Sequence, residues 1–335
     1  MTKEKIHFWE TPYIDWITEI PENWITLVLY TRQARIKAKV VAVVETLCLL
    51  EEWNAKALIG GPFAEQPGVF WLALPRPSTK FVLARLPRLG YVQAVDLLEP
   101  IESRRQNYDK RIVRWRKRDY GLVRVYEEDP RVLRENAPDR RIFLLESSDG
   151  NVRPVRGYRG SGLPLERRGL PVYDARMLVN LVTCRTNGSL LDPFAGIGGI
   201  ILEAEAHGFV PVSVDIDPSL RYGLSHLSAI HCVADARSLP FSSATFDAIA
   251  TEPPYHEKVA MAVVQALQEM NRVLKDGGRL AILCSIIQAE ALLLEAKMLG
   301  LILYLNSPVN RKGLDLYAIA WRKQIDEDPT NVQTT

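Results

Sequence analysis

Short apolar runs alternate with segments of helical periodicity over the second half of the chain. The runs predict strands that cover or end at residues 190–191, 210–214, 230–234, 246–250 and 279–284. Apolar side chains at helical spacing predict helices at residues 171–182, 200–208, 258–273 and 289–298. Two last strands are predicted at residues 301–304 and 314–321. Because strands that alternate with helices build an open, mostly parallel sheet, we expect an α/β domain over residues 170–323.

The first hundred residues carry a less regular pattern. Residues 31–56 contain apolar side chains at helical spacing and predict one long amphipathic helix. Strands are predicted at residues 69–74 and 91–98, and Ser78 is placed to cap a short helix that runs to residue 86. Residues 1–103 are therefore expected to form an α+β module, residues 104–169 a basic connector, and residues 324–335 a disordered tail.

The composition is that of a soluble globular protein with more than one domain. The chain has 335 residues, of which 47% are hydrophobic, so it can bury a substantial core. Its net charge of +2 favours no class of partner. No N-terminal stretch resembles a signal peptide, and no apolar run approaches the roughly 20 residues of a membrane span. We expect a cytoplasmic protein that does not enter a membrane.

Cysteine usage supports the same interpretation. The four cysteines are scattered, without a CxxC pair, and each has apolar or small neighbours: Cys48, Cys184, Cys232 and Cys284. Reduced, buried cysteines are favoured over a disulfide or a metal site, and no metal is expected.

A glycine-rich turn follows the first strand of the α/β domain, in the sequence LLDPFAGIGGIILE. Gly196 and Gly198 lack a Cβ atom, so the backbone can adopt positive φ and let a ligand lie against it. No lysine follows the glycines, which excludes a Walker phosphate loop. The turn predicts a cofactor site.

Acidic residues end the next two strands. Asp215 comes about twenty residues after the glycine turn, where a carboxylate can accept hydrogen bonds from ribose hydroxyls. Asp235, followed by Ala236, is placed to receive an adenine amino group, although an Asp after a strand is often only a turn residue. Asp217, which precedes a proline, suits a helix cap better than a ligand contact.

In order along the chain, ARMLVNL, DPFAGIGGIILEA, DIDP, DARSLPF, EPPY and EMNRVLKDGGRL resemble class I S-adenosylmethionine-dependent methyltransferases. Within that class they most resemble the RNA methylase family that includes the tRNA guanosine-10 N2-methyltransferases of archaea and eukaryotes. The resemblance covers roughly residues 170–323 and implies a Rossmann-like, seven-stranded, mostly parallel sheet closed by a C-terminal antiparallel hairpin. It also implies S-adenosylmethionine as the cofactor.

The resemblance assigns roles to the residues of the glycine turn. Asp192 would lie near the methionine amino group, directly or through water, while Phe194 and Ala195 would shape the turn. The helix before the turn would lie beside the methionine end of the cofactor, so that Tyr173 and Asp174 touch it; the alternative is an ordinary covering helix.

The EPPY segment suggests the chemistry. An exocyclic base amine is a poor nucleophile, and an acidic side chain with a proline carbonyl can accept both of its hydrogens. Glu252 and the carbonyl of Pro253 would be the acceptors, Pro254 would stiffen the loop, and Tyr255 would stack on the base. His256 is expected to be a loop residue that lines the pocket rather than a base.

Glu252 departs from the Asp, Asn or Ser of the family pattern. Three explanations are open. The loop has retreated to accommodate the longer side chain, the substrate differs, or catalysis has been lost while cofactor binding survives. An active enzyme is favoured, because the other motifs are intact.

Eight basic residues crowd the segment between residues 104 and 118. Together with Tyr108 and Trp115 they suit a surface that follows a nucleic-acid backbone, with the indole stacked on a base. The alternative is a solvated helix face with Ile112, Val113 and Trp115 turned to the core. The basic residues are Arg104, Arg105, Lys110, Arg111, Arg114, Arg116, Lys117 and Arg118. Glycine-spaced arginines between residues 153 and 168 either guide RNA or form a linker.

Together these features predict an enzyme that methylates an exocyclic amine of a base in RNA, with guanosine N2 of tRNA as the best interpretation. One alternative is a DNA adenine-N6 or cytosine-N4 methyltransferase. The other is a non-catalytic module that binds S-adenosylmethionine and RNA.

Overall fold

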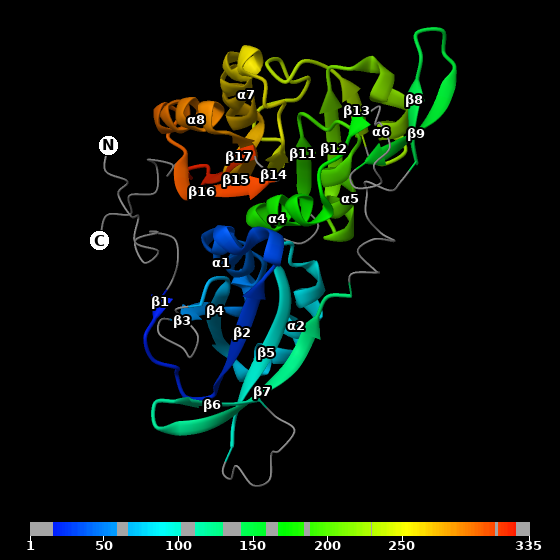
Figure 1. Ribbon diagram of the computed structural model, residues 1–335. Helices are drawn as coiled ribbons and strands as arrows, with labels where there is room; N and C mark the ends of the chain where they lie inside the picture. Colours follow the sequence, from blue (N-terminus) through cyan, green and yellow to red (C-terminus); the bar gives the residue numbers. More distant parts are fainter. Residues whose placement is uncertain are drawn as a thin grey trace, which may run out of the picture.

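The chain folds into two stacked domains (Figure 1). The structure is a computed structural model that describes residues 16–58, 66–101, 111–129, 142–158, 167–183, 188–228, 230–311 and 314–325. Each domain is built on a seven-stranded sheet, and a smaller three-stranded sheet lies beside the C-terminal domain. Across the described ranges, none of the helices combines the length and apolar character that a membrane crossing requires.

The C-terminal sheet has the strand order β13-β12-β11-β14-β15-β17-β16. Neighbours among its first five strands pair in parallel, and the last two form an antiparallel hairpin at the edge. This confirms the predicted Rossmann-like fold. Its strands are β11 (Ser189–Asp192), β12 (Val210–Asp215), β13 (Ile230–Val233), β14 (Phe246–Thr251), β15 (Leu274–Ser285), β16 (Ile302–Arg311) and β17 (Leu314–Arg322).

Helices cover both faces of this sheet, because its central strands are apolar on both sides. Leu190 joins the apolar cluster that includes α4 and α5, whereas its neighbour Leu191 joins the cluster that includes α7 and α8. Successive side chains of a strand point to opposite faces, so one short run contributes to two cores. The helices are α4 (Val172–Val182), α5 (Gly199–Ala206), α6 (Arg221–Ser225), α7 (Ala260–Val273) and α8 (Ile286–Met298).

The N-terminal sheet has the order β1-β3-β4-β2-β5-β7-β6 and is antiparallel except between β1 and β3. Its strands are β1 (Trp16–Ile17), β2 (Trp24–Thr31), β3 (Lys56–Leu58), β4 (Val69–Pro75), β5 (Val92–Pro100), β6 (Arg111–Trp115) and β7 (Arg118–Glu127), and its α-helices are α1 (Lys39–Leu49) and α2 (Thr79–Arg85). Short 3₁₀ helices in the chain are η2 (Gln33–Ala38), η3 (Glu51–Trp53), η4 (Arg76–Ser78), η5 (Leu86–Arg88), η8 (Pro218–Leu220) and η9 (Glu257–Val259).

The long helix predicted over residues 31–56 is wrong. Thr31 ends β2, the basic stretch forms η2, and only residues 39–49 are α-helical. Arg35, within η2, has non-helical dihedral angles and a buried side chain, so the predicted helix is interrupted there. Asn54, in the left-handed conformation, ends η3 before β3 begins. Helix α2 is present as predicted, but the Ser78 side chain makes no capping hydrogen bond.

The connector expected over residues 104–169 is not a single segment. β6 and β7 form a hairpin that extends the N-terminal sheet, and positive φ at Arg116 and Lys117 makes its tight turn. β8 (Ile142–Glu146) and β9 (Val152–Tyr158) pair with each other, and β10 (Arg167–Arg168) joins β9. Phe143, Leu145 and Val155 of this small sheet pack in one cluster with residues of the glycine turn and α6, so it belongs with the C-terminal domain.

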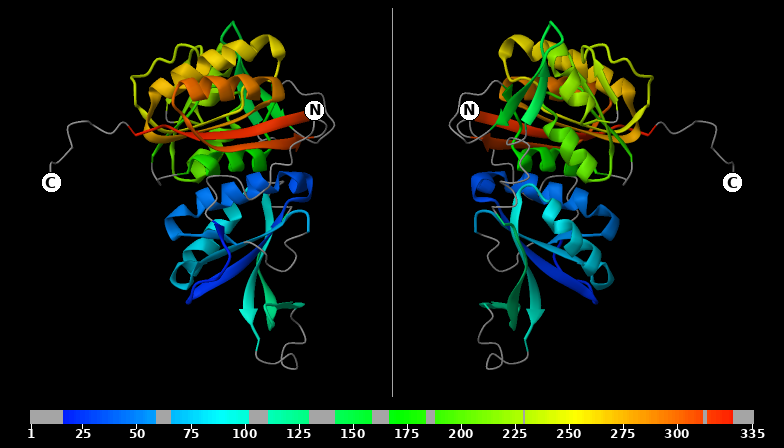
Figure 2. Two further views of the ribbon diagram at one scale, coloured as in Figure 1. Left: turned by 90° about the vertical axis from the view of Figure 1, so that its left-hand side faces the viewer. Right: turned by 90° about the vertical axis from the view of Figure 1, so that its right-hand side faces the viewer.

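The two domains share one apolar core. α1 lies against α4, which itself covers the C-terminal sheet, and one buried cluster includes both helices (Figure 1). Gly90 marks the closest approach, because a Cβ atom there would lie 2.2 Å from the carbonyl oxygen of Tyr173. Figure 2 shows the β6–β7 hairpin at the end of the N-terminal domain that faces away from the C-terminal sheet. The predicted tail lies outside the described residues, except for residues 324–325.

Candidate functional site

The glycine turn connects β11 to α5 and bends through two residues with positive φ. Gly196 has φ of 53° and Gly198 has φ of 80°. An added Cβ atom would meet nothing within 4 Å at Gly196, whereas at Gly198 it would lie 2.8 Å from Leu227. Gly196 therefore borders open space, and Gly198 allows the turn to pack closely on its neighbour.

Asp192 ends β11 behind this turn and is 1% exposed. Its carboxylate accepts hydrogen bonds from the Thr251 hydroxyl at 2.7 Å and from the backbone N–H of Phe194 at 3.1 Å. Burial raises the pKa of Asp192 to about 7, and the nearby carboxylates of Asp215 and Glu252 add to the rise. Both of these donors are neutral, and among the described residues no cation forms an ion pair with the ionised form.

Asp215 ends β12 and braces the glycine turn. Its carboxylate accepts from the backbone N–H of Gly196 at 2.8 Å and from that of Asp217 at 2.9 Å. Asp217 caps η8 by accepting from the N–H of Ser219 at 2.9 Å, which confirms the prediction of a cap. The turn and the second strand are thus tied together through one carboxylate.

Asp235 follows β13, but its carboxylate is held by its own neighbour. Arg237 donates to both of its oxygens from Nε at 3.0 Å and to Oδ2 from Nη2 at 2.5 Å. These hydrogen bonds lower the pKa of Asp235. A ligand that contacts Asp235 must share it with this guanidinium group.

The proline loop, residues 252–255 after β14, is held by side chains from two other elements. Glu252 Oε1 accepts from Arg311 Nη1 at 2.5 Å and from the Tyr255 hydroxyl. The Arg311 guanidinium lies 5.5 Å from the centre of the Tyr255 ring. Gln288, at the start of α8, donates to the Pro254 carbonyl oxygen at 2.7 Å. The conformation of the loop is therefore fixed by side chains from β16 and α8.

Burial and charge act in opposite directions on Glu252. Burial raises its pKa, while the positive charge and hydrogen bond of Arg311 lower it. The pKa of Arg311 is raised in turn, because burial is outweighed by the nearby carboxylates. Arg311 thus stabilises the ionised form of Glu252.

Both loops line one cavity of about 550 Å³. Phe194 and Gly196 of the glycine turn line this cavity, and so do all four residues of the proline loop. The sheet edge adds Asp215, Ile216, Asp235 and Ala236. Ala195 is buried and Gly198 packs on Leu227, so neither lines the cavity. Asp192 lies behind the wall, and His256 is exposed in its loop and is not among the lining residues.

Residues 191–282 match the family model of the methyltransferase domain. The chain contains a methyltransferase domain. The sheet order places it in class I, and the cofactor of this class is S-adenosylmethionine. The cavity suits such a group in size, since pockets for small ligands commonly measure about 300–1,000 Å³. It also offers an open backbone at Gly196, a carboxylate at Asp215 and an apolar side chain at Ile216.

The chain resembles two archaeal enzymes over part of its length. The tRNA (guanine(10)-N2)-dimethyltransferase of Pyrococcus abyssi is 32% identical over 39% of this chain and 45% of its own. The protein of the same name from Methanothermobacter thermautotrophicus is 38% identical over 24% of this chain and 26% of its own. The chain therefore spans less than half the length of these curated relatives.

Two solved structures align with parts of this chain. The crystal structure of TrmN from Thermus thermophilus aligns with 89% of this chain and 99% of its own, at 18% identity and a TM-score of 0.47. PH0226 protein from Pyrococcus horikoshii aligns with 42% of this chain and 83% of its own, at 20% identity and a TM-score of 0.36.

The prediction that Tyr173 and Asp174 face the cofactor is wrong. Neither lines the cavity, and Asp174 is completely buried at the domain boundary. Arg35 of the N-terminal domain donates to both of its oxygens, and the Tyr91 hydroxyl donates to one of them at 2.9 Å. The Tyr173 ring lies 4.7 Å below the Arg35 guanidinium.

Sequence reasoning missed Arg311 and Ile216. Arg311 falls between the two last predicted strands, at residues 301–304 and 314–321. It is instead the last residue of β16, which buries Leu305, Ser307, Val309 and Arg311 at every second position. The sequence contains no signal for this, because Ser307 and Arg311 are polar. Ile216, 66% exposed, directly follows the acidic residue of β12.

The basic segment is only partly visible. Arg104, Arg105 and Lys110 lie outside the described residues, while the other five basic residues are exposed on the β6–β7 hairpin. The helix considered for this segment is wrong, since β6 is a strand. Base stacking by Trp115 is also wrong, because its ring is buried and lies 5.9 Å from the Trp71 ring. Alternation along β6 turns Val113 and Trp115 inward and Arg114 outward.

Proposed function

We propose that this chain transfers a methyl group from S-adenosylmethionine to an exocyclic amine of a base in RNA, with guanosine N2 of tRNA as the best single candidate. The observation that carries the proposal is the cavity itself. Glu252, Pro253 and Tyr255 line the same space as the glycine turn and Asp215. The proposed amine acceptors and the proposed nucleoside-binding residues thus share one cavity.

The cofactor supplies a methyl group on a positively charged sulfur. Asp215 suits the ribose hydroxyls, and Asp235 with Ala236 the adenine edge, with Phe194 and Gly196 beneath them. Asp192 lies behind the residues that line the cavity. Its negative charge would stabilise the positively charged amino group of the cofactor's methionine part, directly or through water.

Glu252 prepares the amine. Both of its protein donors contact Oε1, and among the described residues no hydrogen bond to Oε2 is made. Oε2 and the Pro253 carbonyl oxygen accept the two amine hydrogens, which localises the nitrogen lone pair for an in-line approach to the methyl group. Tyr255 provides an aromatic surface for the base. The proton that the methylated amine loses goes to Glu252 or to water.

The structure supplies a partner for the longer side chain of Glu252. Its additional methylene, worth roughly 1.5 Å of reach, is accompanied by Arg311, which holds the carboxylate from β16. This favours an active enzyme with an adjusted loop over a module that has lost catalysis.

RNA is favoured as the substrate by two observations. The two archaeal relatives are tRNA methyltransferases by name. The β6–β7 hairpin carries exposed arginine and lysine residues. It lies at the end of the N-terminal domain that faces away from the C-terminal sheet (Figure 2). A structured RNA can contact both the hairpin and the cavity, whereas a single nucleotide cannot. Three free cysteines in the described part of the chain are compatible with work in the cytoplasm.

Labelled methyl transfer to RNA from a strain that lacks the gene tests the proposal. The parent chain is expected to label tRNA, and mass spectrometry of its nucleosides to identify N2-methylated guanosine. Label in another base would correct the target, and label in DNA alone would support the DNA alternative. If no nucleic acid is labelled while S-adenosylmethionine binds, the chain is a non-catalytic module.

A further inference from the structure

A row of charged side chains, paired with one another and largely buried, extends from the N-terminal domain to the proline loop. It consists of Arg35, Asp174, Arg311 and Glu252, whose side chains are 3%, 0%, 3% and 17% exposed. Arg35 Nη2 lies 3.0 Å from both oxygens of Asp174, and its Nε lies 3.2 Å from Oδ1. Arg311 Nη1 lies 3.6 Å from Asp174 Oδ2 and 2.5 Å from Glu252 Oε1.

Two carboxylates in this row, those of Asp174 and Glu252, compete for one guanidinium nitrogen. Arg311 Nη1 faces both Asp174 and Glu252, and among the described residues Arg311 Nε has no hydrogen-bond partner. The position of the Arg311 guanidinium therefore depends on the balance between its attraction to Asp174 and its attraction to Glu252. With Arg35 present, two arginines balance two buried carboxylates, and Arg311 takes the shorter contact, the one to Glu252.

Arg35 is itself rigidly held. It donates from Nη1 to the Asn310 carbonyl oxygen at 3.2 Å, and its guanidinium lies within 6 Å of the ring centres of Tyr91 and Tyr173. A planar guanidinium that forms several hydrogen bonds in this way cannot be replaced by the point charge of a lysine.

We infer that Arg35 is a positioning residue for the proline loop. By forming the ion pair with Asp174, it leaves Arg311 free of competition to pair with Glu252. The N-terminal domain then completes the active site of the other domain, in addition to any contact with RNA. Without Arg35, a single arginine faces two buried carboxylates. Arg311 moves toward Asp174, and Glu252 loses its positively charged partner.

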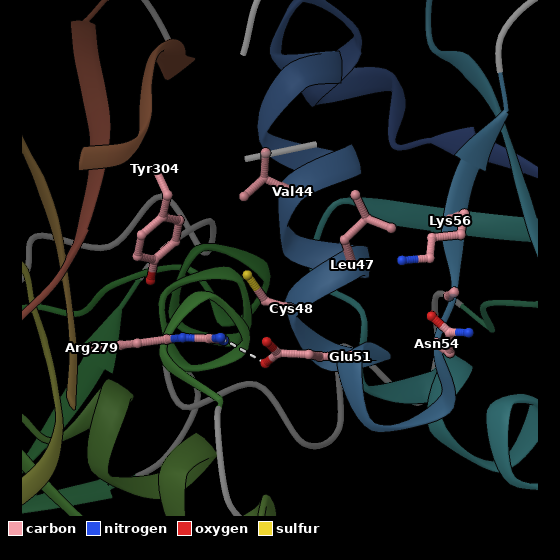
Figure 3. Close-up of a pocket in the computed structure, with 9 residues that line it drawn as sticks. Val44, Leu47, Cys48, Glu51, Asn54, Lys56, Arg279 and Tyr304 are labelled. Carbon is pink, nitrogen blue, oxygen red and sulfur yellow. Dashed lines mark hydrogen bonds and ion pairs between the residues drawn. The ribbon is translucent and has the colours of Figure 1, made fainter. Parts of the chain in front are cut away.

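A second ion pair across the same boundary provides a matched control. Arg279 of β15 lies 2.6 Å from Glu51 of η3 and donates to the Thr183 carbonyl oxygen at 2.8 Å. Figure 3 shows this pair beside a smaller cavity, which has a volume of about 270 Å³ and is also lined by Tyr304 and Cys48. Like Arg35, Arg279 reaches across the boundary, but neither member of this pair contacts Arg311 or Glu252.

The test compares full-length variants for methyl transfer, S-adenosylmethionine affinity and crystal structure. Arg35→Met is expected to lower kcat about 10–100-fold, with cofactor affinity within about 3-fold of the parent, and Arg35→Lys to lie between the two. The double variant Arg35→Met/Asp174→Asn is expected to recover kcat to within about 3-fold, because the competing charge is gone. Glu51→Gln is expected to change kcat less than 2-fold, roughly the scatter of an exposed ion pair.

Rescue by the double variant separates positioning from general destabilisation, since it removes a second buried group and yet restores the rate. Parent-like kcat in Arg35→Lys, or a double variant as slow as Arg35→Met, would overturn the inference. If Arg35→Met does not fold, the lysine and double variants decide.

The inference rests on the proposed function only for its rate measurements. If the parent labels no nucleic acid, the proposed function fails, and the crystal structures still decide. Displacement of Arg311 from Glu252 in the Arg35 variants supports the inference, and an unchanged contact overturns it.

Discussion

Asp192, behind the glycine turn, and Glu252, in the proline loop, are carboxylates on two sides of one cavity wall, and they differ in their partners. Asp192, behind the turn, accepts from a hydroxyl and a backbone N–H, both neutral. Glu252, in the proline loop, accepts from the guanidinium of Arg311. Burial raises the pKa of both.

The difference shows how one cavity can serve two ligands of different charge. An ionised Asp192 leaves a negative charge that a cationic ligand group can balance. The charge of Glu252 is already balanced by the protein, so its free oxygen suits a neutral amine. The partner of each carboxylate, rather than its depth, therefore indicates the ligand expected there.

The largest expected effect comes from removing the charge of Glu252. Glu252→Gln is expected to lower kcat about 100–1,000-fold, because Arg311 loses the negative charge of Glu252 and the single acceptor oxygen of the amide is already taken by Arg311 and Tyr255. Cofactor affinity should stay within about 3-fold. Glu257→Gln, the same change at an exposed position of the next helix, is the control and should leave kcat unchanged. A Glu252→Gln enzyme with more than half of the parent rate would contradict the assignment.

A smaller effect is expected when Asp192 loses its charge. Asp192→Asn should weaken S-adenosylmethionine binding roughly 10-fold at pH 7.5, measured by calorimetry. Because the pKa of Asp192 is about 7, parent affinity should rise from pH 5.5 to 7.5, and the asparagine variant should lose this rise. Above that range the amino group of the cofactor itself loses its proton, near pH 8.

Asp217→Asn is the matched control, since Asp217 caps η8 and does not line the cavity. It should keep both the affinity and the pH dependence of the parent. An equal loss of affinity in both variants would show that the charge of Asp192 is not responsible.

The same substitution should stabilise the fold at high pH. The folded chain binds the proton of Asp192 up to about pH 7, whereas an unfolded Asp releases it near pH 4, so the free energy of unfolding falls as pH rises between these values. Asp192→Asn removes this penalty and should be more stable than the parent by about 1–2 kcal/mol at pH 8. Urea unfolding at pH 8 and pH 4.5 measures the difference, which should shrink at the lower pH.

The smallest effect is expected for solvent-exposed charges on the β6–β7 hairpin, since water screens them more strongly than the carboxylates of Asp192 and Glu252. Arg114→Gln with Lys117→Gln on the β6–β7 hairpin should weaken RNA binding about 3–10-fold at 0.15 M salt and lower the slope of log K against log salt by about 1.4–1.8. Lys80→Gln with Lys297→Gln, exposed positions on α2 and α8, is the control. Equal slopes in both pairs would remove the hairpin from the RNA surface.

Local patterns in the sequence were sufficient for the C-terminal fold and for most of the cavity wall. Apolar runs gave β11, β12 and β14 with boundaries close to those observed, and the residues after them reach the same edge because parallel strands end together. In the N-terminal half, the same reasoning joined η2, α1 and η3 into one helix. Helical spacing alone does not reveal that Arg35 turns inward to meet a carboxylate in the other domain.

The sequence by itself determined the glycine turn, the acidic strand ends and the proline loop, because each depends on residues that are neighbours along the chain. Only the tertiary structure decided the electrostatics. Arg311 lies 59 positions from Glu252, and Arg35 lies 139 positions from Asp174. Such pairs form where packing has excluded water, and a charge has a strong influence on its neighbour only there.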